Sequence, residues 1–492
     1  MSAWIPLTPL LCVALGGLLV MVADVVFKKA PDYAFIASGA LFLAVALSCT
    51  LWSHHQDYTL PAFFGNYLAV DRLALFFDVV ICGGAALCTL LAGAYLREHD
   101  LERGEFYVLI LFSTFGAMVL ARATDLLSVF IGLETMSLGV YSLVAYRRSS
   151  IRSAEGGIKY FLLGSFAAAI FLFGSALLYG ATGSTELVAI GRQISQGSAD
   201  TRLVMFAMVF LIVGVAFKVS AVPFHMWTPD AYEGAVTPVS SYMSVVVKAA
   251  AFALMARIVL VVFGDPLSSN FVTGWPSVIA VLAALSLIVG NLSAIVQRSV
   301  KRMLAYSSIG HAGFILMGIA ASTEMGDAAL SSVFYYLMAY TVSNVLAFGS
   351  LILMGSRGKE AVSYEDLAGV GLRHPLAALP LTVAMLSLMG MPPTAGFFAK
   401  YYVLSAAVSM GGVMTWLAVL GVLSSAVAAY YYLRVLVFAY MKSPEPGAPI
   451  AVPMRSGYVV VGLLVAAFFV IKMGITPQNY LDWAIEAAGR LV

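Results

Sequence analysis

The chain has 492 residues, of which 61% are hydrophobic and 11% are charged, and its mean hydropathy is +0.95. Soluble domains carry about 25% charged residues, so the composition predicts a membrane protein that crosses the bilayer many times and has almost no chain left for a soluble domain. The net charge of +2 favours neither a nucleic-acid partner nor a strongly acidic one. The N-terminus has no basic region before its first apolar run, so we expect no cleaved signal or mitochondrial presequence.

A membrane-spanning helix needs roughly 20 largely apolar residues. By this measure the sequence predicts an all-α fold with about 14 transmembrane helices. The boundary between the fourth and fifth spans is weak, because it rests on Arg122 and Asp125 alone. In chain order the predicted spans are 5–26, 34–52, 73–95, 106–121, 124–146, 158–180, 203–227, 238–263, 272–296, 303–322, 330–354, 376–408, 412–440 and 456–474.

Lysine and arginine are enriched in cytoplasmic loops of membrane proteins. In this chain 15 of them fall in one set of alternate loops and 4 in the other, so the first set is predicted to be cytoplasmic and both termini to lie outside. The first set is Lys28, Lys29, Arg97, Arg103, Arg147, Arg148, Arg152, Arg298, Lys301, Arg302, Arg357, Lys359, Arg373, Lys442 and Arg455; the second is Arg72, Arg122, Arg192 and Arg202.

Two of the predicted spans are interrupted by proline. Span 203–227 breaks at VPFHMWTP and span 376–408 breaks at MGMPPTAG, five spans later. Because five is odd, a second copy of a five-helix unit enters the membrane from the opposite side. The pattern therefore predicts two inverted five-helix repeats, near 106–263 and 272–440, and broken helices at corresponding positions indicate a transport path.

The repeats divide the chain into four parts. Residues 1–105 form an N-terminal three-helix segment, and residues 441–492 hold a last transmembrane helix with an interfacial tail. In the tail, Leu481, Ile485, Ala488 and Val492 fall on one helical face, which is typical of a helix lying at the membrane surface.

A few ionisable side chains remain inside predicted spans, where a charge costs roughly 2.5–3.5 kcal/mol on insertion scales. Those at depth are Glu134, Lys218, Lys248, His311 and Lys400, and Lys159 lies nearer the end of its span. For each there is an alternative to a functional role: an ion pair that holds helices together for Glu134 and Lys248, a lysine that reaches towards the surface for Lys218, Lys400 and above all Lys159, and a satisfied core histidine for His311. Arg257 and Arg434 fit structural or interfacial roles better.

The pattern around these residues favours proton transfer. Ser137 and Tyr141 follow Glu134 at helical spacing, which predicts a polar stripe that faces inward. Burial disfavours the charged form of an amine and a nearby carboxylate favours it, so Lys218 next to Glu134 would be a switchable proton carrier. The break after Lys218 frees backbone groups that must face protein or water, and the acids Asp230 and Glu233 beyond it are predicted to lie in a cytoplasmic loop, at the entrance or as ordinary loop charges.

Other chemistry has no signature in the sequence. The four cysteines, Cys12, Cys49, Cys82 and Cys88, have no metal-site spacing. Only His311 lies at depth, whereas a haem held between helices needs two such histidines, and neither a P-loop nor a dinucleotide fingerprint is present. We therefore expect no cofactor in this chain and an energy source elsewhere.

Five motifs in order, GLETMSLGVYSLVAY, SAEGGIKYFLLGS, FKVSAVPFHMWTPDAYEGAVTP, KRMLAYSSIGHAGF and MPPTAGFFAKYYV, resemble the subunit N family of bacterial respiratory NADH:quinone oxidoreductase (complex I) over nearly the whole chain. The wider family includes two sister subunits and Mrp-type sodium/proton antiporter subunits. HMWTPDAYEG and the absence of a long lateral helix favour subunit N over the sisters.

The resemblance implies a multi-pass proton-translocating subunit of the bacterial inner membrane. Its partners would be the other membrane-arm and peripheral-arm subunits, sister antiporter-like subunits and lipids, and the FMN, Fe–S clusters and quinone would belong to partner subunits. It also implies proton-transfer roles for Glu134, Lys218, Lys248 and Lys400, and for Lys159 and His311. An Mrp-type antiporter subunit and a passive scaffold remain as alternatives.

Overall fold

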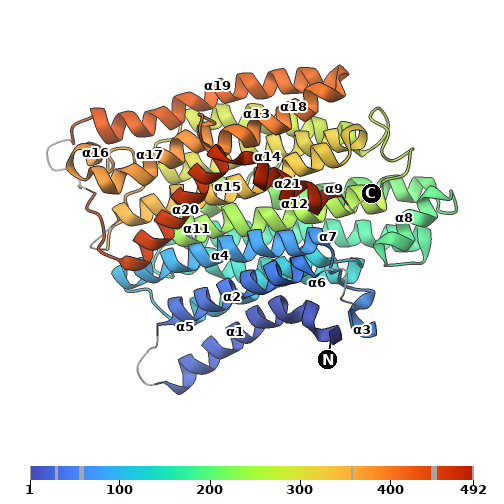
Figure 1. Cartoon of the computed structure of the whole chain (residues 1–492), viewed down its shortest axis with the longest axis horizontal. Coiled ribbons are helices and arrows are strands. Elements are labelled where there is room, and N and C mark those ends of the chain that lie inside the picture. Colours follow the sequence, from blue (N-terminus) through green and yellow to red (C-terminus); the bar gives the residue numbers. More distant parts are fainter. Residues whose placement is uncertain (1, 28–31, 55–59, 356–357, 445–450, 490–492) are drawn as a thin grey trace.

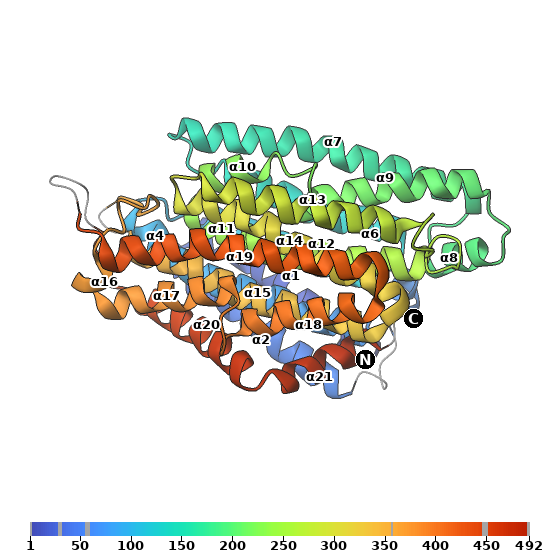
Figure 2. The same cartoon turned by 90° about the horizontal axis from the view of Figure 1, so that it is seen from above.

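The computed structural model describes residues 2–27, 32–54, 60–355, 358–444 and 451–489. Its helices lie side by side in a bundle whose long axes run in roughly one direction (Figures 1 and 2). Their bounds are η1 Ser2–Leu7, α1 Thr8–Val26, α2 Tyr33–Ser53, α3 Ala62–Gly65, α4 Arg72–Glu98, α5 Gly104–Arg122, α6 Leu126–Val144, α7 Ile151–Thr182, α8 Leu187–Ser195, α9 Thr201–Val219, α10 Thr228–Gly234, α11 Thr237–Tyr242, η3 Met243–Val247, α12 Lys248–Arg257, η4 Ile258–Val262, α13 Trp275–Ile295, α14 Val300–Met325, α15 Asp327–Met354, α16 Val370–Arg373, α17 Pro375–Met389, α18 Ala395–Met410, α19 Gly412–Met441, α20 Gly457–Ile475 and α21 Pro477–Ala488.

The predicted spans agree with the helices. Within the described part of the chain, 13 helices are long and apolar enough to cross a membrane, counting α11 to η4 as one helix of residues 237–262. The shorter α17 and its continuation α18 make the predicted span 376–408. The prediction of about 14 transmembrane helices in an all-α fold is confirmed.

The centre of the bundle is formed by α4, α14, α15 and the helix 237–262, which are buried along nearly their whole length. In Figure 1, α19 runs along one edge of the bundle and α1 along the other. Figure 2 shows α7 and α20 on opposite sides. The helix 237–262 carries two π-helical turns, η3 and η4, one on each side of α12. Short π-helical turns inside α-helices occur often at functional sites.

The weak boundary after α5 is confirmed. Asp125 is the N-cap of α6, where its carboxylate accepts a hydrogen bond from the Leu127 amide. One part of the loop-charge count is wrong, however, because Arg122 is the last residue of α5 and is fully buried in an ion pair with Asp78 of α4. Three other counted charges, Lys28, Lys29 and Arg357, lie outside the described residues.

The first predicted break separates α9 from α10. Its freed backbone groups are bonded by protein: the Trp227 indole donates to the Phe217 carbonyl at 3.0 Å, and the Val222 amide donates to Ser286 Oγ at 3.0 Å. Ser220, which ends α9, takes a left-handed conformation with φ 63°. Side chains from the helices themselves therefore complete the interrupted hydrogen-bond ladder.

The second predicted break separates α17 from α18. Gly390 ends α17 with φ 90°, a conformation that glycine adopts at little cost. Across the break the Gly396 amide donates to Ser387 Oγ at 3.2 Å. Both breaks contain a cis peptide bond before a proline, Val222–Pro223 and Pro392–Pro393.

The C-terminal helix α21 packs against α15 and α4. Its buried side chains are Ala484, Ala487 and Ala488. Ile485, which the sequence placed on the packed face, is 42% exposed, so that face is rotated from the prediction because small alanines allow the closest approach to α15. Val492 of the predicted face lies outside the described residues.

Candidate functional site

Lys218 lies one residue before the end of α9 and is buried. Its ammonium donates to Ser137 Oγ at 2.7 Å and to the Tyr141 hydroxyl at 3.0 Å. The same nitrogen lies 5.2 Å from the centre of the Tyr141 ring, in cation–π range. The polar stripe predicted on α6 therefore exists, and its two hydroxyls hold the lysine.

Glu134 lies on α6, one turn before Ser137, and is partly exposed on the surface of the isolated chain. The expected contact with Lys218 is not made: among the described residues no ion pair joins them. Glu134 Oε1 is buried and has no hydrogen-bond partner there. Ser137 and Tyr141 thus take the place that the sequence assigned to the carboxylate, because hydroxyls three and seven residues on reach the ammonium first.

Lys248 begins α12 directly after the π-helical turn η3 and is buried. Its ammonium donates to the Ser308 carbonyl of α14 at 2.5 Å and lies 5.9 Å from the centre of the Tyr340 ring. As predicted from their order in the chain, the helices of Lys218 and Lys248 pack against each other. Lys248 is therefore the group that links the first broken helix to α14 and α15.

His311 of α14 is bound on both sides of its ring. Nδ1 lies 2.6 Å from the Tyr336 hydroxyl and Nε2 lies 3.0 Å from the Tyr432 hydroxyl. The Tyr432 hydroxyl also bonds Ser307. A neutral imidazole donates through one nitrogen and accepts through the other, so the two tyrosines decide which nitrogen carries the proton.

Lys400 lies in the second turn of α18, after its break, and is buried. Its ammonium turns back and donates to the Met389 carbonyl at the end of α17, at 2.9 Å. It also lies 5.3 Å from the centre of the Phe314 ring. Lys218 precedes its break and Lys400 follows its own, as the sequence indicated.

Lys159 of α7 is not at depth. Its side chain is 42% exposed and forms ion pairs with Glu155 at 2.6 Å and Asp230 at 2.7 Å. Asp230 also pairs with Arg302 of α14 at 2.7 Å. The acids that were predicted in a loop lie on α10, so Asp230 joins α7, α10 and α14 at one end of the bundle.

These charges border a cavity of about 300 Å³ whose lining includes Glu155, Asp230, Glu233 and Arg302. Burial raises the pKa of the Asp230 carboxyl, but the hydrogen bonds from Lys159 and Arg302 outweigh burial and hold the pKa below its usual range. Asp230 is therefore an ionised clamp at neutral pH.

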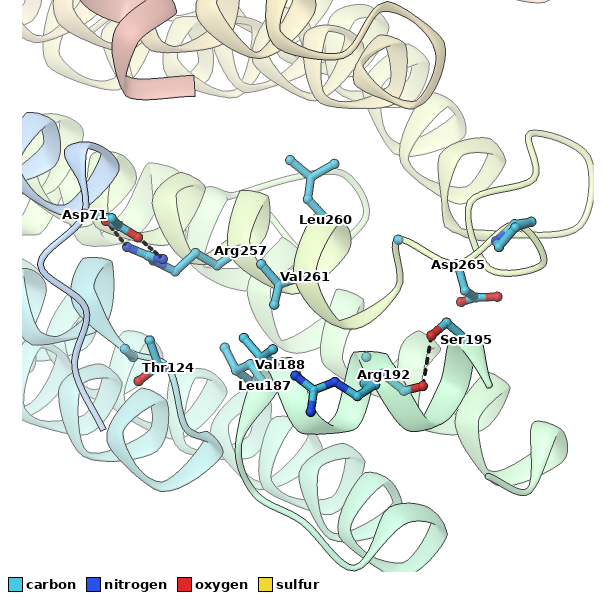
Figure 3. Close-up of a pocket in the computed structure, with 14 residues that line it drawn as sticks. Asp71, Thr124, Leu187, Val188, Arg192, Ser195, Arg257, Leu260, Val261 and Asp265 are labelled. Carbon is cyan, nitrogen blue, oxygen red and sulfur yellow. Dashed lines mark hydrogen bonds and ion pairs between the residues drawn. The ribbon is translucent and has the colours of Figure 1, made fainter. Parts of the chain in front are cut away.

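A second cavity, of about 660 Å³, lies between α8 and the end of η4 (Figure 3). On its wall the two carboxylate oxygens of Asp71 accept from Arg257 at 2.7 and 2.8 Å, which agrees with a structural role for Arg257. None of the buried lysines lines this cavity in the described part of the chain. It is the larger of the two, but it lies apart from the candidate path.

Some functional candidates were missed by the sequence. Tyr336, Tyr340 and Tyr432 surround His311 but resemble ordinary core aromatics in a hydrophobic chain. Asp78 could have been found, because an aspartate inside the apolar span 73–95 needs a partner. Among the described residues no group of three His, Cys, Asp or Glu side chains is placed to hold a metal ion.

The geometry defines a class of membrane protein with buried amines on helices that pack together. The sequence profile of a family described as NADH:quinone oxidoreductase/Mrp antiporter, transmembrane, matches residues 123–427. The fold is similar to a chain of the Mrp complex from Dietzia, with a TM-score of 0.84 at 21% identity over 100% of this chain and 97% of that one. The chain belongs to this family of antiporter-like membrane subunits.

Within the family its relatives are specific. It is 52% identical to NADH-quinone oxidoreductase subunit N 1 of Sorangium cellulosum, over 99% of both chains, and 39% identical to subunit N of Myxococcus xanthus over 99% of this chain and 98% of the relative. A chain of respiratory complex I from Thermus thermophilus matches with a TM-score of 0.79 and 33% identity, over 96% of this chain and 98% of that one. The chain is thus a member of the subunit N branch.

Proposed function

We propose that this chain is the proton-translocating subunit N of a respiratory NADH:quinone oxidoreductase, complex I. The observation that carries the proposal is the set of three buried ammonium groups, Lys218, Lys248 and Lys400, on successive packed elements of a subunit N chain. Each ammonium is bound by a hydroxyl or a carbonyl, and among the described residues none is neutralised by a carboxylate within ion-pair distance. Amines held in this way can give up a proton without breaking a buried ion pair.

The proposed path begins at the cytoplasmic mouth beside Lys159 and Asp230. Approach of Glu134 to Lys218 would favour its charged form, and withdrawal would release the proton. Lys248 takes the proton into the second half, His311 offers an imidazole beside the path, and Lys400 is the last buried acceptor before the outer side. Electron transfer in partner subunits supplies the energy by moving charges along the membrane arm.

We further propose the division of the chain into residues 1–105, 106–263, 272–440 and 441–492. The pairing of helices supports two equivalent units: α5 packs along α6, and α13 packs along α14, in the two most extensive contacts of the bundle. The next helix of each unit, α7 or α15, packs against the broken helix that follows it.

The charge count, 15 against 4, supports cytoplasmic placement of the lysine-rich loops and therefore both termini on the periplasmic side of a bacterial inner membrane. The other membrane-arm and peripheral-arm subunits would be its partners, with FMN, Fe–S clusters and the quinone site held there. The apolar outer faces of the bundle would contact sister subunits and lipids.

The test is to purify the complex that contains this chain from its native membrane. We expect FMN and Fe–S signals, NADH oxidation by quinone, and proton uptake into vesicles driven by NADH. A complex without these signals that exchanges sodium for protons would overturn the proposal in favour of an Mrp-type antiporter.

A further inference from the structure

A small cavity of about 10 Å³ lies between the two groups that would exchange a proton in the second half, Lys248 and Lys400. It is bounded by α14, α15, α17 and α18, and its polar lining is His311, Tyr336, Tyr340, Ser343 and Ser387. A space of this size holds about one water molecule, provided that two to four polar groups can bond it.

One hydroxyl on this lining has free capacity. The Tyr340 hydroxyl is buried and has no hydrogen-bond partner among the described residues. His311, by contrast, is committed on both nitrogens to Tyr336 and Tyr432. A buried hydroxyl without a partner is rare, and an ordered water is the usual explanation in a polar site.

The opposite wall leads to Lys400. Ser343 Oγ and Ser387 Oγ are 2.8 Å apart, and Ser387 also accepts from the Gly396 amide across the break. Ser387 lies two residues before Met389, whose carbonyl binds Lys400. On the other side, Lys248 packs over the Tyr340 ring.

We propose that a water molecule occupies this cavity, bonded by the Tyr340 hydroxyl and the Ser343–Ser387 pair, and that Tyr340 and this water relay the proton from Lys248 to Lys400. The relay rests on the proposed function. A proton leaves the Lys248 ammonium, each hydroxyl or water on the way accepts one proton and gives up another, and the last proton reaches the neutral Lys400 amine. No relay group keeps a charge.

The test uses the assembled complex with Tyr340→Phe, which keeps the ring and removes the hydroxyl. We expect the number of protons pumped per NADH to fall by about fivefold, the factor that one lost hydrogen bond of about 1 kcal/mol is worth. The matched control is Tyr335→Phe on the same helix, whose hydroxyl donates to the Met473 carbonyl away from the cavity and whose loss should leave pumping unchanged.

A second measurement does not depend on activity. A map of the complex that resolves waters should have a peak in this cavity in the unaltered protein and none in Tyr340→Phe. The absence of that peak from the unaltered protein, or full pumping by Tyr340→Phe, overturns the relay. Full pumping by Lys248→Ala and Lys400→Ala would overturn the proposed function instead.

Discussion

The two broken helices hold their lysines differently. In the first half the ammonium of Lys218 is bound by side chains of a neighbouring helix, Ser137 and Tyr141. In the second half the ammonium of Lys400 is bound by a main-chain carbonyl of its own break, Met389. Side-chain hydroxyls can rotate away from a lysine, whereas a carbonyl leaves it only when the backbone moves.

The neighbouring helices explain this difference. Counted from their N-caps, Asp125 of α6 and Ser299 of α14, Glu134 and Ser308 both stand nine residues into the chain, and Ser137 and His311 stand twelve. The first helix therefore offers a carboxylate where the second offers a serine. This comparison indicates that the first half is where coupling charges act, and that the second half is a more fixed acceptor.

The largest effect that we expect concerns stability and tests whether the first half is also the more rigidly anchored. Arg122→Ala leaves Asp78 buried without its partner, which costs about 3–5 kcal/mol. Arg434→Ala in the second half loses two carbonyl contacts and its stacking on Tyr364, which costs about 1–2 kcal/mol. Thermal unfolding of the purified complex should rank them in that order.

The control is the double variant Arg122→Leu with Asp78→Leu, which should recover most of the loss because an apolar pair needs no compensation. Equal destabilisation by Arg122→Ala and Arg434→Ala would contradict the account.

The next effect concerns the hydroxyls around Lys218. Ser137→Ala combined with Tyr141→Phe removes both hydrogen bonds of the ammonium, each worth about 1.5–3 kcal/mol as a bond to a charged group. We expect proton pumping to fall by about tenfold while the complex assembles. Ser142→Ala, an exposed serine on the same helix, is the matched control. Unchanged pumping in the double variant would mean that the hydroxyls do not hold the lysine.

A smaller effect is expected at His311. Tyr432→Phe removes the partner of Nε2 and frees Ser307 but leaves Tyr336 in place. We expect about a threefold loss of pumping, from one neutral hydrogen bond. Tyr430→Phe, on an exposed face of the same helix, should have no effect. A loss equal to that of the Lys218 double variant would place the control of transfer in the second half.

The smallest effect concerns Asp230. Its pKa is lower in the folded chain than its ordinary value of 3.8, so its stabilisation is complete above that value and is lost as the pH falls through the folded pKa. Amide exchange in α10 should therefore speed up below about pH 4, and Asp230→Asn should remove this acid response. Asp482→Asn, exposed on α21, is the control. An acid response that survives in Asp230→Asn would assign the clamp to another group.

Much of the fold could be predicted because lipid imposes it. A continuous apolar run has to be a helix, and a proline inside one has to break it, so the spans and both breaks are found from the sequence. Helix ends were less accurate: α7 begins at Ile151 rather than 158, because its first turns carry polar residues that hydropathy does not count. The π-helical turns beside Lys248 leave no mark in an apolar sequence.

The site was predicted as a set of residues but not as a set of contacts. Helical spacing placed Ser137 and Tyr141 beside Glu134, yet only packing between helices decides that the hydroxyls reach Lys218 before the carboxylate does. The tyrosines around His311 come from α15 and α19, far apart in the chain. Contacts of this kind depend on tertiary packing, which no spacing rule along one helix contains.

The central claim is that Lys218 and Lys400 carry protons. It is tested most directly by the number of protons pumped per electron in complexes with Lys218→Ala and with Lys400→Ala, against Lys472→Ala, an exposed lysine at the end of α20. The account predicts that the ratio falls in both buried-lysine variants, in assembled complexes, and stays constant in the control. An unchanged ratio in Lys218→Ala would contradict it.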